Sequence, residues 1–164
     1  MKGINPKIVE MYNKFVNEIF NADIKITNPF IYMTKGDIMQ LTLNSPFEDL
    51  IKHSVSCTNY ARQSTPNCGV CYPCLIRRAA LNSSNLFSKD SNYRKDIFSS
   101  YPAVNQKSKT LIFDLFRFYK KFQQMTDEEI ILEYFDFIID GLDPKKLIEM
   151  YRRNGKELED CFNV

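Results

Sequence analysis

Four cysteines between residues 57 and 74 are the side chains of this 164-residue sequence with the clearest chemical potential. Cys57 is followed by ten residues and then by the run Cys-Gly-Val-Cys-Tyr-Pro-Cys. Two overlapping C-x-x-C steps let three thiolates reach one ion from a tight turn, and a fourth from the preceding loop closes a tetrahedron. We therefore predict a structural Zn²⁺ site. Its predicted ligands are Cys57, Cys68, Cys71 and Cys74.

The residues between these cysteines suit such a site. Gly69 provides backbone freedom directly after the first cysteine of the run. Pro73 favours the start of a helix, which would place Cys74 in its first turn. Free amides and the helix dipole favour a thiolate at that position.

Besides a zinc site, three other interpretations of the cluster remain open. Disulfides need an oxidising compartment, whereas the sequence begins without the apolar stretch of a signal peptide. Iron–sulfur runs usually carry a fourth cysteine shortly downstream. A redox C-x-x-C normally opens a helix after a strand in a thioredoxin-like unit, a context that is absent here. The remaining cysteine, Cys161, is expected to be an ordinary free thiol.

Composition narrows the class of protein. With 44% hydrophobic and 13% aromatic residues, the chain can bury a proper core. A formal charge of +2 gives no general basis for binding nucleic acid. The sequence has no run of about 18 apolar residues, so no membrane span is predicted. All five glycines are isolated, so no loop can cradle a phosphate, and we expect little or no ATP binding by this chain alone. We expect a soluble, cytoplasmic protein.

The elements that must position the cysteines begin with a predicted helix over residues 6–20. Alternation over 24–27 predicts a short strand, and residues 30–33 form a second apolar run. A capping-box-like pattern at Thr34 begins a short helix. The helix that follows the cysteines is predicted to extend to about residue 81.

The second half of the sequence has a different character. Residues 86–105 resemble a linker or an irregular surface segment. An aromatic-rich helix is predicted over 111–122, a second from the capping box at Thr126 to Gly141, and a third from Asp143. The predicted domains are therefore residues 1–85, a linker over 86–105, and a helical extension over 106–164.

Residues 29–81 resemble the C-terminal part of the 7-cyano-7-deazaguanine synthase (QueC) family. The family pattern is an apolar strand, a helix introduced by Thr/Ser-Lys, then Ser-Cys, a variable loop, and Cys-Gly-x-Cys-x-x-Cys-x-x-Arg before an alanine and an apolar residue. The matching segments here are Pro29-Phe30-Ile31-Tyr32-Met33-Thr34-Lys35, Ser56-Cys57, Cys68-Gly69-Val70-Cys71-Tyr72-Pro73-Cys74-Leu75-Ile76-Arg77 and Ala80-Leu81.

The resemblance implies a fold and several residue roles. It implies a mainly α chain with a small α/β part, the C-terminal portion of an adenine-nucleotide α-hydrolase-like (PP-loop) fold with a four-cysteine zinc knuckle. Lys35 matches a lysine at the start of a helix, where it would face a nucleotide phosphate or the substrate, or remain a solvated helix-end residue. Arg77 would hydrogen-bond nearby backbone or balance the charge of a four-thiolate zinc centre. Its neighbour Arg78 is expected to be exposed.

The resemblance also leaves three functional hypotheses. The family's ATP-pyrophosphatase loop, Ser-Gly-Gly-x-Asp-Ser, does not occur in this sequence. The chain would then be the zinc-binding part of a QueC-like ATP-dependent synthetase, inactive until an ATP-binding half completes it. Alternatively, it would be a QueC-like component of an anti-phage system of the Qat type, or a non-enzymatic, zinc-stapled interaction module. An ATP-binding partner chain, or a homodimer formed through residues 106–164, is the expected partner.

Overall fold

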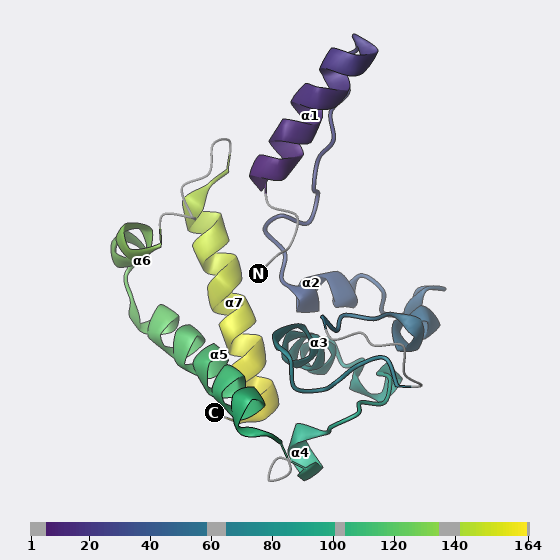
Figure 1. The fold of residues 1–164 in the computed structure, drawn as a ribbon, viewed down its shortest axis with the longest axis vertical. Helices are drawn as coiled ribbons and strands as arrows, with labels where there is room; N and C mark the ends of the chain where they lie inside the picture. The colour runs from purple at the N-terminus through teal and green to yellow at the C-terminus, as the bar shows by residue number, and fades with distance from the viewer. Residues whose placement is uncertain (1–5, 59–64, 101–103, 135–141, 164) are drawn as a thin grey trace.

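The computed structural model describes residues 6–58, 65–100, 104–134 and 142–163, and this part of the chain is mainly helical (Figure 1). The elements in order are α1 (Pro6–Phe20), α2 (Lys35–Gln40), the 3-10 helix η1 (Glu48–His53), α3 (Tyr72–Ser83), the 3-10 helix η2 (Phe87–Lys89), α4 (Ile97–Ser100), α5 (Gln106–Gln124), α6 (Asp127–Glu133) and α7 (Pro144–Phe162). Within those residues the β-type pairing is limited to an isolated bridge between Asn67 and Tyr93. No described helix is both long and apolar enough to cross a membrane. The prediction of a mainly helical chain is confirmed.

Helix α3 is the centre of the packing. It contacts α2 and α7, and α5 lies along α7 (Figure 1). The α3 side chains of Leu75, Ala79, Ala80 and Leu81 are almost completely buried. Two small alanines on one helix allow neighbouring backbones to approach closely, so α3 can be covered on several sides.

Local sequence signals set the helix starts as predicted. The hydroxyl of Thr34 accepts a hydrogen bond from the amide of Asp37, whose carboxylate accepts one from the Thr34 amide in return. Thr126 and Glu129 form the same reciprocal capping box at the start of α6. At the start of α7, the carboxylate of Asp143 accepts hydrogen bonds from two backbone amides. Each cap satisfies amides that have no partner within the helix.

Neither the strand predicted over 24–27 nor the apolar strand that the resemblance implies over 30–33 is formed. Residues 24–27 are extended, but the side-chain amides of Asn13 and Asn17 in α1 hydrogen-bond their backbone at 2.7–3.0 Å, and no described strand lies beside them. Residues 30–33 form a turn. An alternating pattern predicts a strand only where a neighbouring strand is present to complete the hydrogen bonds.

The predicted helix over 6–20 is confirmed as α1, which projects away from the other helices in Figure 1. Large apolar side chains along it remain exposed, with Met11 64%, Phe15 57% and Phe20 66% accessible. An apolar stripe at helical spacing normally packs against another surface, so this face of α1 has no cover within the described structure.

The C-terminal helices enclose apolar residues of their own. Phe122 of α5 and Ile130 of α6 pack in one cluster with Ile148 of α7. Helix α6 ends at Glu133, and the predicted end of this helix at Gly141 lies outside the described residues, as do 135–140. The segment 86–105 contributes the buried side chains of Leu86, Ile97 and Val104. The division into domains stays a prediction.

Candidate metal centre

The four predicted ligands meet at one point. The Sγ atoms of Cys57, Cys68, Cys71 and Cys74 all lie within 4.8 Å of one another, and all four residues are buried. The separation is 3.4 Å between the Sγ atoms of Cys71 and Cys74, 3.8 Å between those of Cys71 and Cys57, and 4.0 Å between those of Cys68 and Cys74. The residues come from two separate segments, so the fold itself brings Cys57 to the other three.

This geometry suits a single tetrahedral ion. A Zn–S bond of about 2.3 Å gives edges of about 3.8 Å between sulfurs in an ideal tetrahedron. The observed separations bracket that value. All three exceed a disulfide S–S length of about 2.05 Å by more than an ångström, and every one of these cysteines is a free thiol. The four residues could therefore hold a metal ion.

The backbone between the ligands explains how three cysteines reach one point. Gly69 adopts a φ of +83°, and a Cβ at this position would collide with the carbonyl oxygen of Lys95. The chain thus turns in a conformation that only glycine adopts without strain. Cys71 is then the N-cap of α3, and the amide of Cys74 donates to the Cys71 carbonyl at 2.9 Å. The predicted start of a helix around Pro73, with Cys74 in its first turn, is confirmed.

The thiols polarise one another strongly. Hydrogen bonds from Cys71 and Cys74 lower the pKa of Cys68 to about 3. Hydrogen bonding to Cys68 and Cys71, together with burial, raises the pKa of Cys74. The amide of Cys68 also donates to the Sγ of Cys57 at 3.3 Å. A lowered pKa at Cys68 favours the thiolate form that binds a metal ion.

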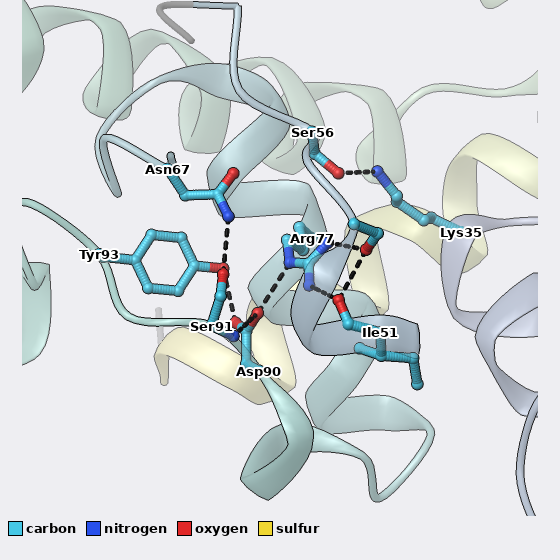
Figure 2. Close-up of polar contacts among 9 residues, drawn as sticks. Lys35, Ile51, Ser56, Asn67, Arg77, Asp90, Ser91 and Tyr93 are labelled. Atoms are coloured by element: carbon cyan, nitrogen blue, oxygen red, sulfur yellow. Dashed lines mark hydrogen bonds and ion pairs between the residues drawn. The ribbon is translucent and has the colours of Figure 1, made fainter. Parts of the chain in front are cut away.

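A second segment, residues 90–95, braces the first cysteine of the run. The amides of Arg94 and Lys95 donate to the carbonyls of Asn67 and Cys68 at 2.9 and 3.2 Å. The fully buried side chain of Asn67 donates to the Ser91 hydroxyl at 2.7 Å (Figure 2). The position of Cys68 is therefore fixed by contacts 24 to 27 residues away in sequence.

Arg77 connects three segments of the chain by hydrogen bonds. Its guanidinium, completely buried, donates to the Asp90 carboxylate at 2.8 Å, to the Ser54 hydroxyl at 2.6 Å and to the Ile51 carbonyl at 2.7 Å (Figure 2). The second oxygen of Asp90 accepts a hydrogen bond from the Tyr93 hydroxyl at 2.6 Å. Arg77 thereby fixes the end of η1, and with it the chain that leads to Cys57.

The segment that contains these residues matches a known protein family. The family is that of queuosine biosynthesis protein QueC, and the match covers residues 4–85, half of the chain. This chain belongs to the QueC family. The resemblance inferred from the sequence is thus shown, and the matched range contains all four cysteines of the metal centre together with Arg77. No curated protein and no solved structure matches this QueC-family chain.

Lys35 of this QueC-family chain contacts the segment that leads into the metal centre. Its Nζ donates to the hydroxyl of Ser56 at 2.7 Å, one residue before Cys57 (Figure 2). Burial, and then the nearby charge of Arg77, lower the pKa of Lys35. A lysine in this setting loses its proton more readily than an exposed one.

A carboxylate from α7 occupies the space at the start of α2. The hydroxyl of Thr34 donates to Glu157, and the same carboxylate lies directly against Gly36. Burial raises the pKa of Glu157, whose Oε2 has no hydrogen-bond partner among the described residues. The start of α2, where the resemblance implies that Lys35 faces a phosphate or the substrate, thus lies against a side chain of the C-terminal helix.

The expectation that Arg78 is exposed is wrong. It is 4% accessible, and its guanidinium donates to Asp96 at 2.5 Å and stacks over the Tyr93 ring at 3.9 Å. The reason is that α3 is covered on nearly every side, so consecutive arginines are both buried. Each must then find a carboxylate in the segment that follows the helix.

Sequence reasoning missed the residues that support the cysteines. Asp90, Asn67 and Tyr93 contact the metal loop or its arginine, yet Asp90 and Tyr93 lie in the segment that the sequence predicts to be a linker. A buried arginine requires an acidic partner, but the sequence offers several nearby carboxylates and no means of choosing among them.

Proposed function

We propose that this chain is the zinc-binding C-terminal part of a QueC-like ATP-dependent synthetase, a 7-cyano-7-deazaguanine synthase-like ligase that is inactive alone. The observation that carries the proposal is the convergence of four buried cysteines within the segment that matches the QueC family. Family chemistry is adenylation of a carboxylate followed by ammonia transfer. The site residues proposed for this chain are ligands and binding groups rather than catalytic groups.

The proposed metal is a structural Zn²⁺. Four cysteine ligands leave no coordination position for water or substrate, so a catalytic role for the ion is excluded by its ligand set. Its contribution would be to folding, because it joins the loop at Cys57 to the start of α3. The free thiols also suit a reducing compartment, which is consistent with the proposed cytoplasmic location.

Nucleotide binding is proposed to come from outside this sequence. No Ser-Gly-Gly-x-Asp-Ser motif is present, and the isolated glycines offer no other phosphate loop. An ATP-binding half of the PP-loop fold would complete the enzyme. Lys35 would then reach a phosphate or the substrate carboxylate, which requires its contact with Ser56 to open.

The proposed domains are residues 1–85, which hold the family match, and 106–164, a helical extension joined through 86–105. We propose that the extension docks the partner chain or a second copy. Its closeness to the metal centre supports a structural role as well, because Ile112, Leu115 and Leu158 share one apolar cluster with the four cysteines.

A second candidate function is a non-enzymatic interaction module. The exposed apolar face of α1 favours it, because such a face is normally covered by a partner. The same face is also available to an ATP-binding half. The two functions therefore differ in what the assembled complex does, and not in whether a partner binds.

The test is an activity measurement on the chain alone and in complex with an ATP-binding chain that carries the Ser-Gly-Gly-x-Asp-Ser motif. The substrate offered is 7-carboxy-7-deazaguanine with ammonia. We expect AMP and pyrophosphate from the complex only, and no ATP hydrolysis by the isolated 164-residue chain. A stable complex that forms no AMP would support the interaction module instead. ATP hydrolysis by the isolated chain would contradict both.

A further inference from the structure

A cavity of about 570 Å³ is lined by residues of α4, of α5 from Ile112 to Gln123, and of the C-terminal part of α7. Helices α5 and α7 lie side by side in Figure 1. The walls of the cavity are mainly apolar and aromatic. They include Ile97, Ile112, Phe116, Leu158 and Phe162. This volume lies within the range of about 300–1,000 Å³ typical of small-molecule sites, and its lining has the apolar character of such sites.

The floor of the cavity is formed by closely packed residues of α5 and α7. Gly155 of α7 lies so close to α5 that a Cβ there would come within 3.0 Å of the Tyr119 ring and 2.7 Å of the Gln123 amide. Tyr119 is buried and accepts a hydrogen bond from the Asn154 side chain at 2.9 Å. The buried floor is thus held in place by packing and hydrogen bonding, so the cavity does not depend on exposed side chains alone.

The cavity has few polar groups, and its cationic side chains outnumber its carboxylates. Arg117 and Lys120, both on α5, have no ion-pair or hydrogen-bond partner within the part of the chain that the structure describes. Glu159 on α7 is the opposing carboxylate, and the Lys156 amine lies 4.0 Å from it. Two unpaired cations therefore face one carboxylate that already has a cation beside it.

We propose that this cavity binds an amphipathic carboxylate, a medium-length acyl chain whose head group pairs with Arg117 and Lys120. The apolar walls would cover the chain, while the two cations would hold the carboxylate at the rim. A sugar phosphate would leave the apolar walls uncovered, and a lipophilic cation would meet two like charges. This site is separate from the proposed function and uses none of the metal-centre residues.

The binding experiment uses the complete, metal-loaded chain and three probes of equal chain length. Dodecanoate, dodecan-1-ol and dodecyltrimethylammonium are titrated calorimetrically below their micelle concentrations. We expect one saturable site for dodecanoate, weaker binding of the alcohol and weakest binding of the cation. Decanoate should bind more weakly than dodecanoate, by up to about fourfold for each methylene that is buried. The proposal is overturned by the absence of saturable dodecanoate binding, or by equal binding of the carboxylate and the cation.

Two variants with matched controls locate the site. The double charge reversal Arg117→Glu with Lys120→Glu changes exposed residues and should weaken dodecanoate binding about tenfold. Lys107→Glu with Lys145→Glu makes the same change in net charge at exposed residues outside the cavity and should leave affinity within about twofold.

The apolar wall is tested in the same way. Phe113 lines the cavity but is 62% exposed, so Phe113→Asp should fold and lose most of the dodecanoate affinity. Leu132→Asp, at a 71% exposed position of α6 outside the cavity, is the control. If affinity is unchanged in both the charge-reversal variant and Phe113→Asp, dodecanoate binds elsewhere and the proposed site is wrong.

Discussion

Arg77 and Asp90 form a buried ion pair, with 2.8 Å between Nε and Oδ1 and side-chain exposures of 0% and 8%. The pair joins α3 to the segment that follows η2, and it fixes the chain on both sides of the metal centre. The net contribution of a buried ion pair to stability is small, but removing one member leaves the other charge buried without a partner. An unpartnered buried guanidinium would be costly.

Asp90→Ala should therefore lower the free energy of unfolding by about 3–5 kcal/mol, because it leaves the Arg77 charge buried without a carboxylate. Asp90→Asn keeps one hydrogen-bond acceptor for Arg77 and should cost less. The control is Asp49→Ala, whose carboxylate pairs with Lys89 at 3.1 Å and is 76% exposed, so its removal should lower the free energy of unfolding far less. Urea denaturation measures all three, and equal losses for Asp90→Ala and Asp49→Ala would show that the buried pair is not a support of the fold.

Cys71→Ser should abolish metal binding and cooperative unfolding of the region around α3. Structural zinc in small domains provides about 10–16 kcal/mol of apparent binding free energy, which exceeds the total stability of most domains. Cys161→Ser is the matched control, because Cys161 is a free, half-buried thiol whose pKa burial raises to about 11. Thermal unfolding followed by circular dichroism compares them. An unchanged melting temperature for Cys71→Ser would mean that the cluster is not structural.

The buried carboxyl of Glu157 should make the free energy of unfolding depend on pH. Burial raises its pKa above the ordinary value of 4.5, so between these two pKa values the folded state binds more protons than the unfolded state. Its contribution to stability is therefore greatest at low pH and declines as the pH rises through that window. In Glu157→Gln this decline should be absent, so the variant gains stability relative to the wild type above the window and not below it. Urea denaturation at several pH values tests this, and a constant difference would contradict the assignment.

Lys35 should titrate below the exposed lysines, because burial and the Arg77 charge lower its pKa. NMR of reductively ¹³C-methylated protein resolves the lysine resonances, and Lys35→Arg identifies the relevant one. The expected result is a midpoint for Lys35 below the ordinary lysine value of 10.5. Any function that needs the Lys35 cation would accordingly decline at a lower pH than for an ordinary lysine. A midpoint at that ordinary value would place Lys35 in solvent rather than beside Ser56.

The sequence predicted what depends on neighbours along the chain. Cap residues such as Thr34 and Thr126 act within one helical turn, so their helices begin where predicted. The C-x-x-C spacing and Gly69 likewise bring three cysteines together locally. These signals are readable because the physical interaction spans only a few residues.

The features that the sequence did not predict depend on distant contacts. Glu157 meets Thr34 across 123 residues, and Asp90 was one of several acids available to Arg77. Residues 24–27 have the pattern of a strand, yet asparagines of α1 take the hydrogen bonds that another strand would supply. In each case a tertiary contact, and not local preference, decides the outcome.

The most direct test of the metal centre is elemental mass spectrometry of the purified chain, prepared under reducing conditions without added metal. We expect one zinc per chain, retained in Cys161→Ser and lost in Cys71→Ser. Iron with acid-labile sulfide, or a cooperatively folded chain that contains no metal, would contradict this expectation.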